Sequence, residues 1–239
     1  MIRPNVRASF GRREAELLLA IAGPAGEARL REEGFDALLD DASLVHRLLQ
    51  RGSVSLAPAP LVFYLLVRHA LLEREIHDRR LADYTAAVLL EFGRVRRSAS
   101  DGEEPLPDTL YLADVLDEVE RARGEREFLL RAHLGNLALW LGGVFPDFIT
   151  ERVQRRGAPP LAYYDALGAA GFRGAAGTRD AVRLGLGDLF LSFADQFSDV
   201  RSALNGLSDA LFFPHPKDGV ERVLREVSDR FHRRVREQG

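Results

Sequence analysis

The sequence predicts an all-α protein. Apolar residues recur with the helical period along nearly the whole chain, and no segment shows the sustained alternation of apolar and polar residues that is typical of strands. Gly and Pro interrupt the pattern where helices are expected to end or begin. No internal repeat of about 20–50 residues is present, which argues against a regular solenoid. We expect about nine to eleven helices packed into one compact domain over residues 1–239.

The first part of the chain predicts three short helices, each bounded by a capping residue or proline and a glycine. Their start and stop residues are Ser9 and Gly23, Pro24 and Gly34, and Asp36 or Asp41 and Gly52. A Pro-rich connector follows, since each proline disfavours helix in the residue before it. The fourth helix runs from about Pro60 to His77 and is apolar over much of its surface, which indicates a central position.

Asp78 is a cap for the fifth helix, which is expected over about 79–97. The polar, acidic segment 98–108 contains two prolines and is the clearest loop in the chain. It either divides the protein into subdomains 1–97 and 109–239 or forms a surface loop of one domain.

The second half predicts further helices, delimited by caps, prolines and glycines. They are expected from Asp108 to about Arg123, Glu125 to Leu141, Pro146 to Arg156, onward from Pro159-Pro160, Thr178 to about Phe197, Asp199 to Phe212, and Asp218 to Gln238. The segment before Gly142-Gly143 is apolar almost all round and is expected to be buried.

The composition bounds the function. The apolar share of 46%, the charged share of 29% and the net charge of −3 are those of a globular protein with no global attraction to nucleic acid or to an anionic membrane. The chain has no Cys, which excludes disulfides and thiolate chemistry. Its basic residues are almost all Arg, and its longest apolar run is far shorter than the about 20 residues of a membrane span. We expect a bacterial, cytoplasmic protein.

Three residues on the fourth helix form a candidate metal site. His69, Glu73 and His77 are spaced four residues apart on this helix, which puts all three along one face, one turn apart. Imidazole and carboxylate groups suit Zn, Fe or Mn, with His46 or His133 completing the set. The order of residues is not HExxH, so a hydrogen-bonded interior histidine is the alternative interpretation.

A second group of candidates binds a ligand without metal. His133 and Asn136 lie in the apolar seventh helix, where buried polar groups need partners from a ligand or from an internal network. Tyr163 and Tyr164 point to different sides of their helix: one is expected to pack against Trp140 or Phe145, and the other to present its hydroxyl.

The third candidate is an anion site. Gly168, Gly171, Gly174 and Gly177 recur every third residue, and Arg173 and Arg179 lie beside a helix start expected at Thr178. Amide groups at a helix start together with two arginines can hold a phosphate or carboxylate. The alternative is that these glycines end one helix and let the next pack closely.

No nucleophile, catalytic base or cofactor motif stands out in the sequence. The leading hypothesis is therefore a non-enzymatic helical module that binds a protein or a small ligand and carries no cofactor. One alternative is a metal-dependent helical enzyme that uses the His/Glu cluster, and another is a regulatory domain that binds an anionic ligand. The last helix has an apolar stripe with mixed charges, so it docks on the core or pairs with a second copy or another protein, and no nucleic-acid or membrane partner is expected.

Overall fold

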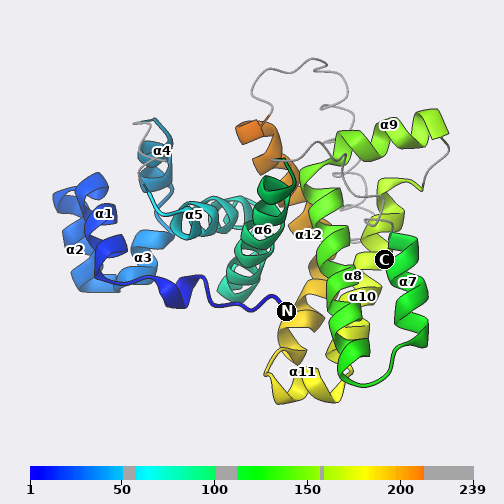
Figure 1. Ribbon diagram of the computed structural model, residues 1–239. Helices are drawn as coiled ribbons and strands as arrows, with labels where there is room; N and C mark the ends of the chain where they lie inside the picture. The colour runs from blue at the N-terminus through cyan, green and yellow to red at the C-terminus, as the bar shows by residue number, and fades with distance from the viewer. Residues whose placement is uncertain (51–56, 101–111, 157–158, 213–239) are drawn as a thin grey trace.

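The computed structural model describes residues 1–50, 57–100, 112–156 and 159–212. Every regular element in these ranges is helical, which confirms the all-α class (Figure 1). A short 3-10 helix, η1 (Arg7–Ser9), precedes twelve α-helices. These are α1 (Arg12–Ala22), α2 (Pro24–Glu33), α3 (Phe35–Leu39), α4 (Ala42–Gln50), α5 (Ala59–Leu72), α6 (Arg79–Ser100), α7 (Leu112–Arg121), α8 (Glu125–Val144), α9 (Pro146–Arg156), α10 (Leu161–Ala176), α11 (Arg179–Arg183) and α12 (Gly187–Phe212).

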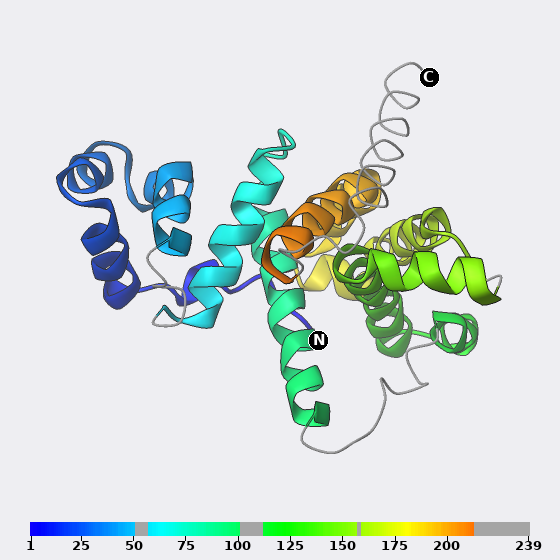
Figure 2. The same ribbon diagram turned by 90° about the horizontal axis from the view of Figure 1, so that it is seen from above.

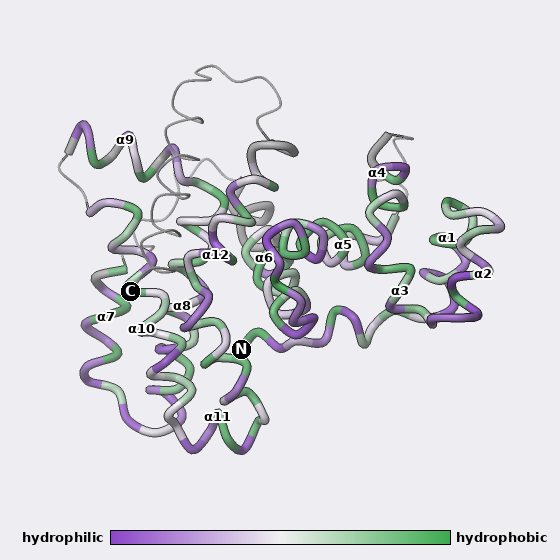
Figure 3. Tube along the Cα trace, turned by 180° about the vertical axis from the view of Figure 1, so that it is seen from behind, coloured by the Kyte–Doolittle hydropathy of each residue, from purple (hydrophilic) through white to green (hydrophobic). Residues whose placement is uncertain are grey.

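The core of the fold is a bundle of α8, α10 and α12, each of which packs on the other two. The second half of α8 is buried from Leu134 to Trp140, as its apolar sequence predicts. Helices α5 and α6 pack on each other and on α12, and α7 covers α8. Figure 2 shows α5 and α6 between this bundle and the N-terminal helices α1–α4. In Figure 3 the central α5 is mostly hydrophobic, whereas the outer α2 and α9 carry mainly hydrophilic residues.

The N-terminal segment ties α1–α4 to α5 and α6. The backbone N–H of Arg7 donates to the buried Asp83 carboxylate on α6 at 2.6 Å, and the Arg7 side chain forms an ion pair with Asp36 at 2.8 Å. The ring of Phe10 packs edge-on against Tyr64 of α5. The first residues therefore contact helices that lie far from them in the sequence.

Glycines bring α8 and α10 into backbone contact. A Cβ atom on Gly171 would lie 2.9 Å from both the carbonyl oxygen of Arg131 and the amide nitrogen of Gly135. Gly168, Gly171 and Gly174 do not end a helix, because α10 runs through them, but they let neighbouring helices and side chains pack closely, as the alternative interpretation expected. Only Gly177 ends the helix, and Thr178 caps α11 as expected, accepting from the N–H of Ala181 at 3.2 Å.

Several predicted boundaries differ from the structure for local reasons. The third predicted helix is divided into α3 and α4, and Asp41 caps the second of these through Ser43. Gly185, with φ of 65°, separates α11 from α12, which were expected as one helix. The break expected between Phe197 and Asp199 is a kink at Gln196 inside α12.

The starts of α1 and α6 can also be compared with the prediction. Ser9 lies in η1 rather than capping the first helix; Gly11 precedes α1 instead, and its N–H donates to Glu14. The cap by Asp78 is confirmed, since its carboxylate accepts from the N–H of Arg80 at 2.8 Å. The loop predicted over 98–108 lies outside the described residues from 101 onward, and so does the predicted helix from Asp218 to Gln238.

No single helix in the described ranges is long and apolar enough to cross a membrane; α8 and residues Ile149–Arg155 meet that test only as a pair, bent by 89°.

Replacing Gly171 by Ala is expected to lower the free energy of unfolding by about 2–3 kcal/mol, because the new methyl group meets backbone atoms that cannot rotate away. Gly206→Ala is the matched control, since a Cβ atom at this position of α12 meets no atom within 4 Å. Ala is the better helix former, so the control is expected to gain up to about 1 kcal/mol. Urea unfolding measures the free energy of unfolding of both variants. Equal changes in Gly171→Ala and Gly206→Ala would contradict the close approach of α8 and α10.

Candidate ligand-binding site at the α6–α8 crossing

A row of aromatic rings joins α6 and α8. The Phe92 ring of α6 is stacked between two rings of α8, with its centroid 6.2 Å from His133 and 5.6 Å from Trp140. The interplanar angles are 11° and 23°. Phe145 meets Trp140 edge-on at 5.4 Å. We call these four residues the aromatic row.

Helical geometry explains why the row forms. His133 and Trp140 are seven residues apart on α8, so their side chains lie two turns apart on one face. Asn136 lies between them on the same side of the helix. Tyr84 and Phe92 are eight residues apart on α6, and both meet α8 or its neighbours. The ring of Phe92 therefore packs against the face of α8 that carries His133 and Trp140.

His133 is the exposed end of the row. We expected His133 to be buried with the rest of its apolar helix, but its side chain reaches the surface beside α6. Contact with Phe92 and the surrounding atoms still withdraws water from the imidazole and lowers the pKa of His133 below its ordinary value of 6.5. The positive charge of the amino terminus lowers the pKa further, and Glu118 opposes it. His133 is therefore neutral at pH 7 and can donate or accept a hydrogen bond.

Asn136 lies beneath the row and is buried, as predicted. Its Oδ1 atom has no hydrogen-bond partner, and neither has the hydroxyl of Tyr84. Burial among aromatic rings raises the pKa of Tyr84 far above its ordinary value of 10.0, and the neighbouring Asn136 side chain partly opposes this shift. The Asn136 and Tyr84 side chains therefore interact with each other across the crossing, although not with the geometry of a regular hydrogen bond.

The buried polar side chains of α12 at the end of α8 are satisfied. Asn205 of α12 donates to the carbonyl groups of Gly142 and Gly143, both at 2.7 Å, and Ser208 donates to Val144 at 2.9 Å. Arg201 donates to Asn205 and to Asp165 of α10. Sequence reasoning missed this network, although polar residues spaced along the apolar face of α12 were the available signal. Against it, the unpartnered atoms of Asn136 and Tyr84 stand out.

The predicted metal residues do not share a helix face. Helix α5 ends at Leu72, and Glu75 adopts a left-handed conformation with φ of 61°. The N–H of Ile76 then donates back to the carbonyl of Leu71 at 3.0 Å, which closes the helix end. The chain has left the helix before His77, so the predicted four-residue ladder is broken. Among the residues that the structure describes, no group of three His, Asp or Glu side chains is placed to hold a metal ion.

His69 instead belongs to the join between α3 and α5. Its Nε2 atom lies 3.1 Å from the carbonyl oxygen of Leu39, to which it donates. Next to it, the buried Arg68 forms an ion pair with Asp40 at 2.7 Å and donates to the carbonyl of His77, while Arg79 reaches the same carboxylate at 2.6 Å. Burial lowers the pKa of His69, which agrees with the alternative interpretation of a hydrogen-bonded interior histidine.

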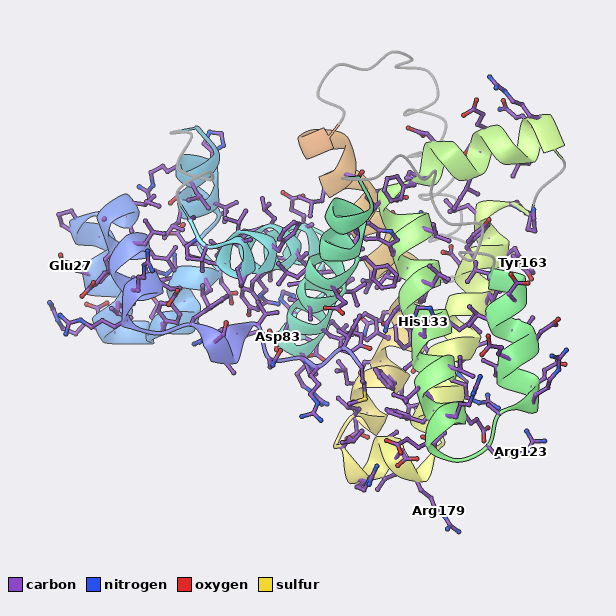
Figure 4. All side chains as sticks on the ribbon, viewed as in Figure 1. Glu27, Asp83, Arg123, His133, Tyr163 and Arg179 are labelled. Carbon is purple, nitrogen blue, oxygen red and sulfur yellow. The ribbon has the colours of Figure 1, made fainter. Side chains whose placement is uncertain are left out.

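The remaining candidates lie elsewhere, as Figure 4 shows for Tyr163 and Arg179 relative to His133. Tyr163 is exposed and packs edge-on against Tyr164, while Trp140 and Phe145 contact each other. Arg173 forms an exposed ion pair with Asp195 at 2.9 Å. Arg179 is exposed at the first position of the five-residue helix α11. The structure thus unites two of the six predicted ligand-binding residues, His133 and Asn136.

Comparisons of the chain with family models, with curated proteins and with solved structures find no match. The interpretation of the site therefore rests on its own geometry.

The buried state of His69 makes stability depend on pH. Its folded-state pKa lies below 6.5, so the unfolded chain binds the proton first as the pH falls. The contribution of His69 to stability is present above pH 6.5 and is lost as the pH falls below it. We expect His69→Gln, which keeps a donor for Leu39, to lose less stability than the native protein between about pH 7.5 and about pH 5.5 in urea unfolding. The control is His77→Gln, which replaces an exposed histidine and is expected to lose as much stability over this pH range as the native protein. If His69→Gln loses as much stability as His77→Gln, His69 is not a buried, hydrogen-bonded histidine.

Asn136→Leu is expected to raise the free energy of unfolding by about 1 kcal/mol, because it replaces an unsatisfied buried acceptor by an apolar group of similar volume. The matched control is Asn205→Leu, which breaks the hydrogen bonds of Asn205 with Arg201, Gly142 and Gly143 and is expected to cost about 3 kcal/mol or more. Chemical denaturation measures both changes. A destabilised Asn136→Leu protein would mean that Asn136 is satisfied in solution.

Proposed function

We propose that this protein is a non-enzymatic helical binding module whose ligand or partner contacts the α6–α8 crossing. The observation that carries the proposal is the aromatic row, with the neutral, exposed His133 at one end and the buried Asn136 on the same face of α8. Binding sites combine apolar and aromatic walls with a few polar groups that fix orientation, and the crossing has both.

The arrangement of the charged residues favours binding over catalysis. Asp40 and Arg68 join helices in the N-terminal half, and Asp165 and Arg201 do so in the bundle. These side chains are held by their partners rather than directed at a reacting group. The bacterial, cytoplasmic setting expected from the Arg-rich, Cys-free composition is part of the proposal. A protein partner at the predicted last helix remains a prediction outside the described residues.

The single tryptophan makes the site directly observable. Trp140 is the only Trp of the chain, so 5-fluorotryptophan gives one ¹⁹F resonance from the aromatic row. In a screen of small planar fragments, we expect some to shift this resonance saturably. Their affinity is expected to fall about tenfold in His133→Ala, a loss of about 1.4 kcal/mol.

The control variant is His77→Ala, which removes an exposed histidine of the segment between α5 and α6 and leaves the aromatic row intact. It is expected to bind the same fragments with unchanged affinity. Fragments that shift the resonance equally well in His133→Ala, or a screen with no saturable shift, would reject the α6–α8 crossing as the binding surface.

A further inference from the structure

The amino-terminal residues form an arm that runs along the outside of the helices. This arm, residues 1–11, contains the single 3-10 turn η1 and no other regular element. Figures 1 and 2 both place the amino terminus between α6 and α8. The arm therefore reaches from the start of α1 to the two helices that carry the aromatic row.

Asp83 of α6 anchors the arm at its middle. Its buried carboxylate accepts from the N–H of Arg7 at 2.6 Å, and the N–H of Val6 is a second donor to it. Burial raises the pKa of Asp83, and these two N–H groups oppose the shift. The side chain of Val6 is itself buried. Release of this part of the arm takes both donors from a buried carboxylate, so we expect the anchor at Val6 and Arg7 to stay closed.

The end of the arm, residues 1–5, is held more weakly. Ile2 is half-buried and packs against the core, whereas Met1, Arg3 and Asn5 are exposed. The N–H of Asn5 donates to the carbonyl of Arg3 at 3.0 Å, which is a bond within the arm itself. A terminal segment of this kind opens at a small cost compared with a packed helix. Residues 1–5 can therefore move about the anchor while the helices stay in place.

The free end of the arm lies beside His133. The positive charge of the amino terminus lowers the pKa of His133, so the two groups are within electrostatic reach of each other. His133 is the exposed end of the aromatic row and stacks on Phe92. A ligand at this end of the row and the end of the arm therefore compete for the space between α6 and α8.

We propose that residues 1–5 form a strap that closes over the His133 end of the aromatic row, moves about the anchor at Val6 and Arg7, and has to open before the α6–α8 crossing is occupied. The inference rests on the proposed binding function and adds its regulation. A closed strap lowers the apparent affinity of the site in proportion to the fraction of molecules in which the strap is open. For a strap that is open in about one molecule in ten, removal raises the affinity about tenfold.

Deletion of residues 2–5 tests the strap with two readouts. The deletion removes Ile2 and moves the amino group toward the Asp83 anchor, so we expect the pKa of His133 to rise toward its ordinary value of 6.5. The ¹H NMR resonances of the imidazole measure this pKa, and His133→Gln assigns them among the six histidines. Fragments from the 5-fluorotryptophan screen are expected to bind the deletion variant about tenfold more tightly than the native protein.

Two substitutions in the full-length chain separate opening of the strap from loss of residues. Ile2→Ser removes the apolar contact that holds the strap closed, so it is expected to reproduce both effects of the deletion. Asn5→Ser is the matched control at an exposed position of the same strap. It is expected to change neither the pKa of His133 nor the affinity for fragments.

An unchanged pKa of His133 in the deletion variant overturns the inference, because the strap then does not lie at the crossing. A raised pKa with unchanged fragment affinity also overturns it, because the strap then lies beside His133 without limiting access. If no fragment binds the native protein or the deletion variant, the proposed binding function fails and the strap has no site to control. The pKa of His133 then shows separately whether the arm lies at the crossing. Fragments that bind only the deletion variant support both proposals.

Discussion

The fold depends on how the protein ends its most buried helix. Helix α8 lies against α7, α10 and α12, so the last carbonyl groups of α8 face the interior rather than water. Unsatisfied carbonyls at such a helix end are costly. Helix α12 solves this with Asn205 and Ser208, which donate to the carbonyls of Gly142, Gly143 and Val144. The same two glycines let α12 approach, since a Cβ on Gly143 would lie 2.8 Å from Leu204. Close packing and hydrogen bonding between α8 and α12 therefore act as one constraint. This constraint fixes the position of α12, and α5 and α6 in turn pack on α12.

The N-terminal half is held by a different kind of interaction. Its helices α1–α4 are short and meet α5 over a limited area, so apolar burial alone is a weaker constraint there than in the bundle. Charged groups supply the specificity. Asp40 receives both Arg68 and Arg79, and this combination holds the pKa of Asp40 below its usual value against the opposing effect of burial. Removing one member of such a group leaves an uncompensated charge, which costs more than the group contributes when complete. The bundle is thus held by close packing and buried hydrogen bonds, and the N-terminal half by ion pairs. The amino-terminal segment contacts both α3 and α6 through Arg7.

The sequence predicts well what local chemistry decides and poorly what a distant residue decides. Helical periodicity, Pro24, Gly34 and the Asp78 cap sufficed for the fold class and for several helix ends. The end of α5 was missed because a Glu, rather than a Gly, occupies the left-handed position at residue 75. The glycines of α10 were expected to end a helix because their place inside it depends on contact with α8, which lies elsewhere in the chain. At the candidate site, His133 and Asn136 were recognisable as polar residues in an apolar helix. Their counterparts Phe92 and Tyr84 come from α6, and nothing in their local sequence distinguishes them from ordinary core residues.

The contrast between Asn136 and Asn205 bears on why the protein keeps a polar residue under the aromatic row. Both are buried asparagines beside α8 or on it, but Asn205 is fully engaged and Asn136 leaves its oxygen unpaired. A buried amide that holds a fold together is expected to have the hydrogen bonds of Asn205. An amide that serves a ligand is expected to be incomplete without it, because its stabilising partner arrives only on binding. Such a residue lowers the stability of the free protein and raises its affinity for a ligand that supplies the missing hydrogen bond. Stability is often lower at functional sites for this reason.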